Sequence, residues 1–176
     1  MALVGRCAVL PFVFFLITGA GRTADLPALV PAPNSIAAKP CSQSGMPLGR
    51  ALRFARDIDP GGFALVRERW RALGIPAPVR AARPEVTARV LADARSDAPV
   101  RYGLDIGAAA VRIRASNGAA VFDALATLAQ LPVRHGRAWM LPCVAIADRP
   151  ALRWRIVSDD ISRGPFPTMR LSLIHI

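Results

Sequence analysis

The stretch YGLDIGAAAVRIRASNGAAVFDALATLAQL, residues 102–131, holds two strand-like patterns followed by a helical one. Apolar residues alternate with polar ones in YGLDIG and again in VRIRA, which is the pattern of strands with one buried face. The short break from Gly107 to Ala109 separates the two patterns. A connection this tight predicts that the two strands pair as a hairpin.

The second half of this stretch, NGAAVFDALATLAQL, predicts a helix directly after the hairpin. Asn117 or Ser116 can cap its first turn, and Pro132 ends it. Its large apolar residues share one helical face: Val121, Leu125, Leu128 and Leu131. A hairpin followed by an amphipathic helix is typical of a sheet with a helix packed against it.

The segments before residue 102 predict one more helix and several short strands. PGGFALVRERWRALGIP, residues 60–76, has apolar residues at helical spacing, with Arg67, Glu68 and Arg71 facing outward. The Pro-rich segment 25–47 predicts an extended entry with one short strand, and GMPLGRALRFA, residues 45–55, predicts an edge strand. EVTARVLA, residues 85–92, alternates with Val86, Ala88 and Val90 on one face.

After the second helix, AWMLPCVAIAD, residues 138–148, predicts strand structure broken at Pro142. Residues 25–148 are therefore expected to form one α+β domain, in which helices pack on one face of a mixed or antiparallel sheet. A chain of 176 residues with 53% hydrophobic residues is long and apolar enough for one such core.

The net charge of +11 comes almost entirely from arginine, because Lys39 is the only lysine. The arginines occur singly among alanines and prolines, without the clustered charge that a nucleic-acid binder needs. The composition therefore favours a protein that does not bind nucleic acid.

The N-terminus has the pattern of a secretory signal peptide. Residues 7–20 form an uncharged apolar run, which is shorter than a membrane-spanning helix. Small residues before Ala20 indicate cleavage there, so the expected signal peptide is 1–20, with a second potential cut after Ala24. We expect an exported chain, periplasmic or extracellular, with no membrane segment after cleavage.

Export would allow Cys41 and Cys143 to form a disulfide, and the sequence leaves this open against two free thiols. The other chemistry-bearing residues show no motif of a cofactor or metal site. His135 and His175 lack metal-ligand spacing, and His135 is expected in a loop after the second helix. No phosphate-binding loop or nucleophile motif is present, so no cofactor is expected.

Three stretches in this order resemble the N-terminal part of glycoside hydrolase family 20, the β-N-acetylhexosaminidases. LPALVPAPNSI, residues 26–36, is similar to the family's Pro-rich opening. Residues 102–131 are similar to its strand–strand–helix unit with a TL-x-QL finish. LPCVAIADRPALRWRIVSDDISRG, residues 141–164, is similar to the linker into the catalytic barrel. The segment from Cys41 to Ser96 contributes little to the resemblance.

The resemblance implies that residues 149–170 begin a (β/α)8 TIM barrel, of which this chain holds only the first strand. In the family, the substrate's own 2-acetamido group attacks the anomeric carbon, and an acidic pair on a later strand assists. By resemblance, Arg155 grips sugar hydroxyls, and Asp160 and Arg163 match the family's D-x-S-R. The alternative for Arg155 is a structural ion pair with Asp160.

The same region departs from the family pattern at several positions. Ile156 replaces a glycine, Gly164-Pro165 replaces a histidine or aromatic pair, and Asp159 adds an acid. These departures indicate a divergent branch. The last six residues, LSLIHI (171–176), back-translate to a sequence similar to a transposon-end adapter, so we expect them to be read-through from a truncated gene.

The expected parent protein is an exported glycosidase that removes terminal N-acetylhexosamine from glycans. The chain as given is expected to be inactive, because the barrel and its acidic pair are missing from it. The alternative is a small secreted carbohydrate-binding or accessory domain without catalysis. That alternative needs exposed aromatic side chains, and the candidates are Trp70, Tyr102, Trp139 and Trp154.

Overall fold

The computed structural model describes residues 26–41, 45–91 and 101–150. Twelve elements follow one another in these ranges, and their bounds are β1 (Ser35–Ala38), β2 (Met46–Pro47), β3 (Arg53–Phe54), α1 (Pro60–Ala72), β4 (Val79–Arg80), β5 (Val86–Val90), β6 (Tyr102–Ile106), β7 (Val111–Ala115), α2 (Gly118–Gln130), β8 (Val133–His135), β9 (Ala138–Leu141) and β10 (Val144–Asp148).

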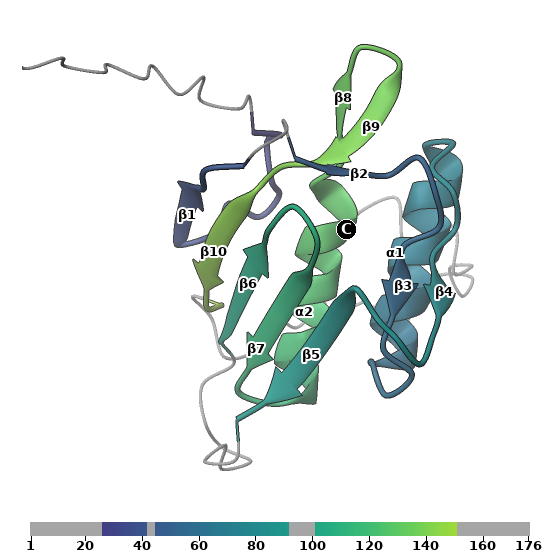
Figure 1. Ribbon diagram of the computed structural model, residues 1–176. Coiled ribbons are helices and arrows are strands. Elements are labelled where there is room, and N and C mark those ends of the chain that lie inside the picture. The colour runs from purple at the N-terminus through teal and green to yellow at the C-terminus, as the bar shows by residue number, and fades with distance from the viewer. Residues whose placement is uncertain (1–25, 42–44, 92–100, 151–176) are drawn as a thin grey trace, which may run out of the picture.

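The larger sheet has seven strands in the order β1-β10-β6-β7-β5-β3-β4. Its first half is antiparallel, whereas β5 runs parallel to β7 and β3 runs parallel to β5 and β4. Both helices lie on the same face of this sheet, and α2 crosses behind β6 and β7 (Figure 1). The predicted α+β domain with a mixed sheet and helices on one face is thus confirmed within the described residues.

The hairpin and both helices form where the sequence predicts them. β6 pairs antiparallel with β7, from Tyr102 opposite Ala115 to Ile106 opposite Val111. The apolar residues of both strands are buried and the residues between them are more exposed. The side chain of Asn117 accepts a hydrogen bond from the backbone N–H of Ala120 at 2.9 Å, which caps α2.

The hydrophobic core fills the space between the sheet and the two helices. Trp70 of α1 and Phe54 of β3 are fully buried, and their ring centroids lie 6.3 Å apart in an edge-to-face arrangement. Leu125 and Leu128 of α2 are also fully buried. The sheet and both helices therefore share one hydrophobic core.

Three expectations about strands need correction. Residues 45–55 form two short strands rather than one edge strand, because β2 joins a second sheet and β3 lies inside the large one. His135 ends strand β8 instead of lying in a loop, since it pairs with Ala138 across a hairpin. Val90 is 48% exposed, so the alternating pattern of β5 loses its buried face at the strand's end.

The second sheet is small, with the order β2-β9-β8. Its β8–β9 hairpin projects beyond the large sheet, and β9 leads into β10 across Pro142 (Figure 1). The predicted break at Pro142 is therefore confirmed, and it is the point where the chain passes from one sheet to the other.

Candidate functional site

Arg155, which is predicted to contact substrate, lies outside the described residues. Its predicted supports, Asp160 and Arg163, lie outside them too. The proposed barrel strand, signal peptide and adapter segment lie outside them as well. The structure does describe the end of β10, where the chain leaves the domain toward these residues. We call the cluster formed there by Asn34, Tyr102, Thr127, Asp148 and Arg149 the junction.

The junction ties the exit of the domain to its entry. The Asp148 carboxylate accepts a hydrogen bond from the backbone N–H of Asn34 at 3.0 Å. In return, the Asn34 side-chain oxygen accepts one from the backbone N–H of Arg149 at 2.9 Å. These two bonds hold residue 149 beside β1, so its position depends on side chains as well as on the sheet.

The junction also connects the sheet to helix α2. The hydroxyl of Tyr102 lies 2.6 Å from that of Thr127 and donates to the Asp148 carboxylate at 3.3 Å. Burial raises the pKa of Tyr102 to about 12, although the Thr127 hydroxyl acts in the opposite direction; the charge of Asp148 adds to the rise. The phenol is therefore a neutral hydrogen-bonding group at neutral pH.

A hollow of about 470 Å³ lies beside the junction, at the end of β6, β7 and β10. Its lining includes three arginines, Arg101, Arg114 and Arg149. No sequence motif indicates this cluster, because the three arginines are far apart along the chain. Only the pairing of β10 with β6 and of β6 with β7 brings them together.

The structure joins Cys41 and Cys143 in a disulfide, with their Cα atoms 6.0 Å apart. The backbone N–H of Lys39 also donates to the carbonyl of Cys143 at 2.8 Å. This pairing, which the sequence left open, fastens the segment after β1 to the turn between β9 and β10. It closes a loop with a sequence separation of 102 residues.

A second charged cluster holds β3 and β5 together at the opposite side of the sheet. Glu85 accepts hydrogen bonds from the side chain of Arg50 and from the backbone N–H of Arg53, the latter at 3.0 Å. The Arg50 guanidinium lowers the pKa of Glu85 to about 2; burial opposes this shift, and Arg53 adds to it. This carboxylate is engaged in structural bonds.

The aromatic residues that the sequence offers for carbohydrate binding differ in their burial. Trp70 and Tyr102 are buried, and Arg134 lies over the ring of Trp139 with 5.0 Å from the guanidinium carbon to the centroid. Trp154 lies outside the described residues.

In the described ranges, no group of three or more His, Cys, Asp or Glu side chains is placed to hold a metal ion. The same ranges contain no helix long and apolar enough to span a bilayer.

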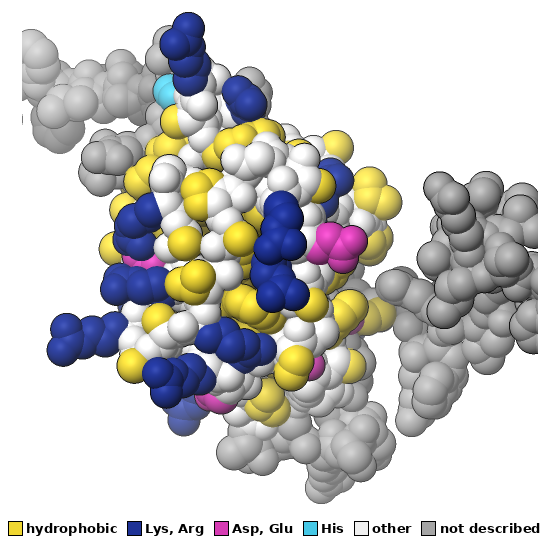
Figure 2. Space-filling model, turned by 90° about the vertical axis from the view of Figure 1, so that its right-hand side faces the viewer, with side chains coloured by type: hydrophobic (Ala, Val, Ile, Leu, Met, Phe, Trp, Pro, Cys, Tyr) yellow, Lys and Arg dark blue, Asp and Glu magenta, His cyan; other side chains and the backbone are white. Residues whose placement is uncertain are grey.

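The basic residues are distributed differently on different parts of the surface. Figure 2 shows lysine and arginine side chains spread among hydrophobic and other side chains on the side of the molecule where α1 and β4 lie. This dispersal agrees with the scattered arginines of the sequence. The hollow beside the junction is where arginines from distant parts of the chain meet.

Comparison with known proteins shows which protein family the described domain resembles. The sequence profile of glycosyl hydrolase family 20, domain 2, matches residues 26–149. The exo-β-N-acetylglucosaminidase of Vibrio harveyi in complex with N-acetylglucosamine matches in fold with a TM-score of 0.58 and 21% identity, over 71% of this chain and 19% of that one. No curated protein sequence matches the chain significantly.

Two further solved structures match over similar lengths. A glycoside hydrolase family 20 β-N-acetylglucosaminidase is 27% identical with a TM-score of 0.52, over 74% of this chain and 24% of that one. The Streptomyces plicatus N-acetyl-β-hexosaminidase in complex with Thio-NAglucal is 25% identical with a TM-score of 0.50, over 71% and 26%. This chain thus spans about a fifth to a quarter of the length of these structures.

The fold and these matches define an α+β domain of a glycoside hydrolase. The chain belongs to glycosyl hydrolase family 20, and residues 26–149 correspond to that family's domain 2. The resemblance inferred from the three sequence stretches is confirmed.

Proposed function

We propose that this chain is the N-terminal part of an exported glycosidase that removes terminal N-acetylhexosamine residues from glycans. The observation that carries the proposal is the family match over residues 26–149, which ends where the sequence begins to resemble the entry to a catalytic barrel. Residues 1–20, or 1–24, act as the signal peptide in this proposal, and residues 171–176 are read-through.

The proposed reaction is substrate-assisted hydrolysis. The carbonyl oxygen of the substrate's 2-acetamido group attacks the anomeric carbon while a carboxylic acid protonates the departing glycosidic oxygen. Water then attacks the same carbon, breaks the new C–O bond and gives a product with the starting configuration. A second carboxylate orients the acetamide during both steps. Both carboxylates belong to the barrel and not to the domain described here.

Arg155 binds hydroxyl groups of the terminal sugar in this scheme, because a guanidinium donates two parallel hydrogen bonds to neighbouring oxygens. Asp160 and Arg163 support the loop that follows. The domain contributes by fixing the chain's exit. The bonds of Asn34 and Asp148 set the position of Arg149, only six residues before Arg155.

The proposal is tested on the full reading frame that contains this sequence. Its product is expected to release nitrophenol from nitrophenyl N-acetyl-β-glucosaminide and not from nitrophenyl β-glucoside, which lacks the acetamide. Replacing the acetyl group with trifluoroacetyl should slow the reaction, because the carbonyl oxygen becomes a weaker nucleophile. Equal rates on the glucoside would contradict the proposal.

The role of Arg155 and the inactivity of the short chain have separate tests. Arg155→Lys in the full enzyme should raise KM for the N-acetylglucosaminide, while Arg137→Lys, at an exposed arginine between β8 and β9, serves as the control. The chain of 176 residues alone should release no nitrophenol above background. Export is tested by sequencing the N-terminus of the secreted product, which should begin at residue 21 or 25.

A further inference from the structure

The face of the large sheet that points away from the helices carries a row of side chains in register. Ser35 of β1 lies opposite Ala147 of β10, Ala147 lies opposite Gly103 of β6, and Gly103 lies opposite Arg114 of β7. On the far side of Arg114, the next residue in the row is Arg89 of β5. The row therefore begins with small residues and ends with two arginines.

The small residues form the floor of the hollow beside the junction. Ser35, Gly103 and Ala147 all line it, and their short side chains leave the surface low between the larger residues around them. Nothing in the packing requires a glycine at position 103. A Cβ added there would meet no atom closer than the carbonyl oxygen of Ile146 at 3.9 Å.

The charged residues that line this hollow are mostly positive. Arg101, Arg114 and Arg149 line it together with a single acid, Asp148, whose carboxylate already accepts bonds from Asn34 and Tyr102. Within the described ranges, the three guanidinium groups make no side-chain hydrogen bond or ion pair with the protein. Their hydrogen-bond donors are available to a ligand.

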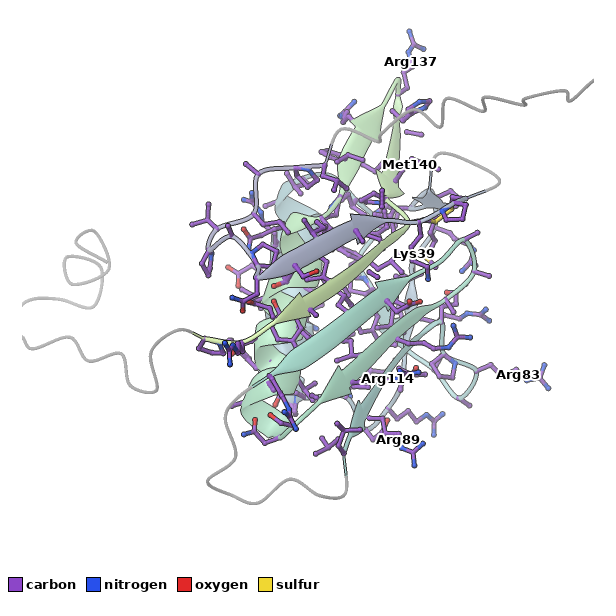
Figure 3. All side chains as sticks on the ribbon, turned by 90° about the vertical axis from the view of Figure 1, so that its left-hand side faces the viewer. Lys39, Arg83, Arg89, Arg114, Arg137 and Met140 are labelled. Carbon is purple, nitrogen blue, oxygen red and sulfur yellow. A yellow bond between two sulfur atoms is a disulfide. The ribbon has the colours of Figure 1, made fainter. Side chains whose placement is uncertain are left out.

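The neighbouring strand increases this charge. Arg89 and Arg114 are direct cross-strand neighbours on one face, an arrangement that is unfavourable without a counter-ion. Both lie on the sheet side in Figure 3, whereas Arg137 projects from the tip of the distant β8–β9 hairpin. The nearest acid on this face, Asp105, is held by Lys39 through both carboxylate oxygens, at 2.9 and 2.8 Å.

We propose that the hollow binds an acidic saccharide, a sugar chain that carries sulfate or carboxylate groups. Guanidinium groups pair with such oxyanions through two parallel hydrogen bonds. The volume of about 470 Å³ falls in the range of small-molecule sites. The site goes beyond the proposed glycosidase function, which concerns N-acetylhexosamine and residues after Pro150.

The lining favours a saccharide over a nucleic acid. Single-stranded nucleic acids need aromatic faces on which bases stack. The one aromatic residue in the lining is Tyr102, whose side chain is 6% exposed and points toward α2. Asn34 and Ser35 instead contribute an amide and a hydroxyl group to the lining, and these groups suit sugar hydroxyls.

The test measures binding of the full chain to short dextran sulfate by calorimetry, with unsulfated dextran of the same length as the neutral probe. We expect saturable binding of dextran sulfate and none of dextran. The triple variant Arg101→Gln, Arg114→Gln, Arg149→Gln should bind at least about tenfold more weakly. The matched control removes three exposed arginines elsewhere: Arg69→Gln, Arg71→Gln and Arg137→Gln.

A second variant tests the hollow without changing charge. Gly103→Ile fills the floor with a side chain that suits a strand, so it should weaken binding severalfold while thermal unfolding stays unchanged. The proposal is overturned if the control triple weakens binding as much as the site triple, which would indicate net charge alone. It is equally overturned if Gly103→Ile binds like the unaltered chain, or if a DNA oligonucleotide of matched charge binds more tightly.

Discussion

Gly62 and Leu125 bring the two helices into direct contact. A Cβ at position 62 would lie 2.5 Å from Leu125 Cδ1, closer than Cβ atoms of folded proteins approach, and 3.0 Å from Leu125 Cβ, which is tighter than most Cβ contacts. Both residues are buried. The glycine is therefore the reason that α1 and α2 can pack at this distance.

Gly62→Ala is expected to destabilise the domain by about 1–3 kcal/mol, because Leu125 must move within a filled core. Gly61→Ala is the control in the same helical turn. Its added Cβ would meet only ordinary contacts, the closest at 3.4 Å from Asp59 Oδ2. That change should leave stability the same or raise it by about 0.5–1 kcal/mol, since alanine favours a helix. Urea unfolding of both variants measures the difference, and equal losses would contradict the packing argument.

The disulfide predicts a stability that depends on oxidation. Cys41→Ala with Cys143→Ala should lower the free energy of unfolding by about 2–4 kcal/mol, because the open chain gains the entropy of a long loop. Unfolding followed by circular dichroism measures this loss. A reducing agent should bring the unaltered chain close to the double variant and leave the variant itself unchanged. A variant that loses stability on reduction would show that another thiol is involved.

Glu85 predicts a loss of stability in acid. Its pKa is about 2 in the folded domain and ordinarily about 4.5, so the stabilisation is complete above pH 4.5. It declines as the pH falls toward 2, because the unfolded chain takes up the proton first. Glu85→Gln should be less stable at pH 7 and should flatten this part of the curve. Glu68→Gln, at an exposed acid of α1, is the control and should follow the unaltered chain.

Tyr102 predicts the opposite behaviour at high pH. Its pKa of about 12 exceeds the ordinary value of 10, so the folded domain keeps the phenol proton that the unfolded chain loses. Stability should be unaffected below pH 10 and should fall between about 10 and about 12. Tyr102→Phe removes this decline and costs about 1 kcal/mol at neutral pH through lost hydrogen bonds. Absorbance of the tyrosinate would give the pKa directly, because Tyr102 is the only tyrosine of the sequence.

The sequence was sufficient where periodicity is local. Alternation in residues 102–115 and helical spacing in residues 117–131 predict β6, β7 and α2, because each pattern is set by one buried face. The sequence was insufficient for strands whose neighbours in the sheet come from distant parts of the chain. β3 has only two residues, and its place between β4 and β5 depends on parallel pairing that no short pattern encodes.

The same limit applies to the sites. The resemblance to the family pointed to Arg155, Asp160 and Arg163, which lie beyond the described residues, and those assignments stay predictions. The basic hollow has no motif, because one of its arginines directly precedes β6, one lies in β7 and one directly follows β10. Sheet register alone creates it. The signal that could have found it is the pairing of small residues with arginines on one strand face, which becomes visible only once strand order is known.

Strand β1 has a consequence for how this domain is made. Its hydrogen-bonded neighbour in the sheet is β10. Ser35–Ala38 therefore cannot pair until Val144–Ala147 has been synthesised. At ordinary translation speeds, a ribosome needs about 5–20 s to synthesise the intervening chain. During that interval the earliest strand lacks the partner strand with which it pairs in the folded domain.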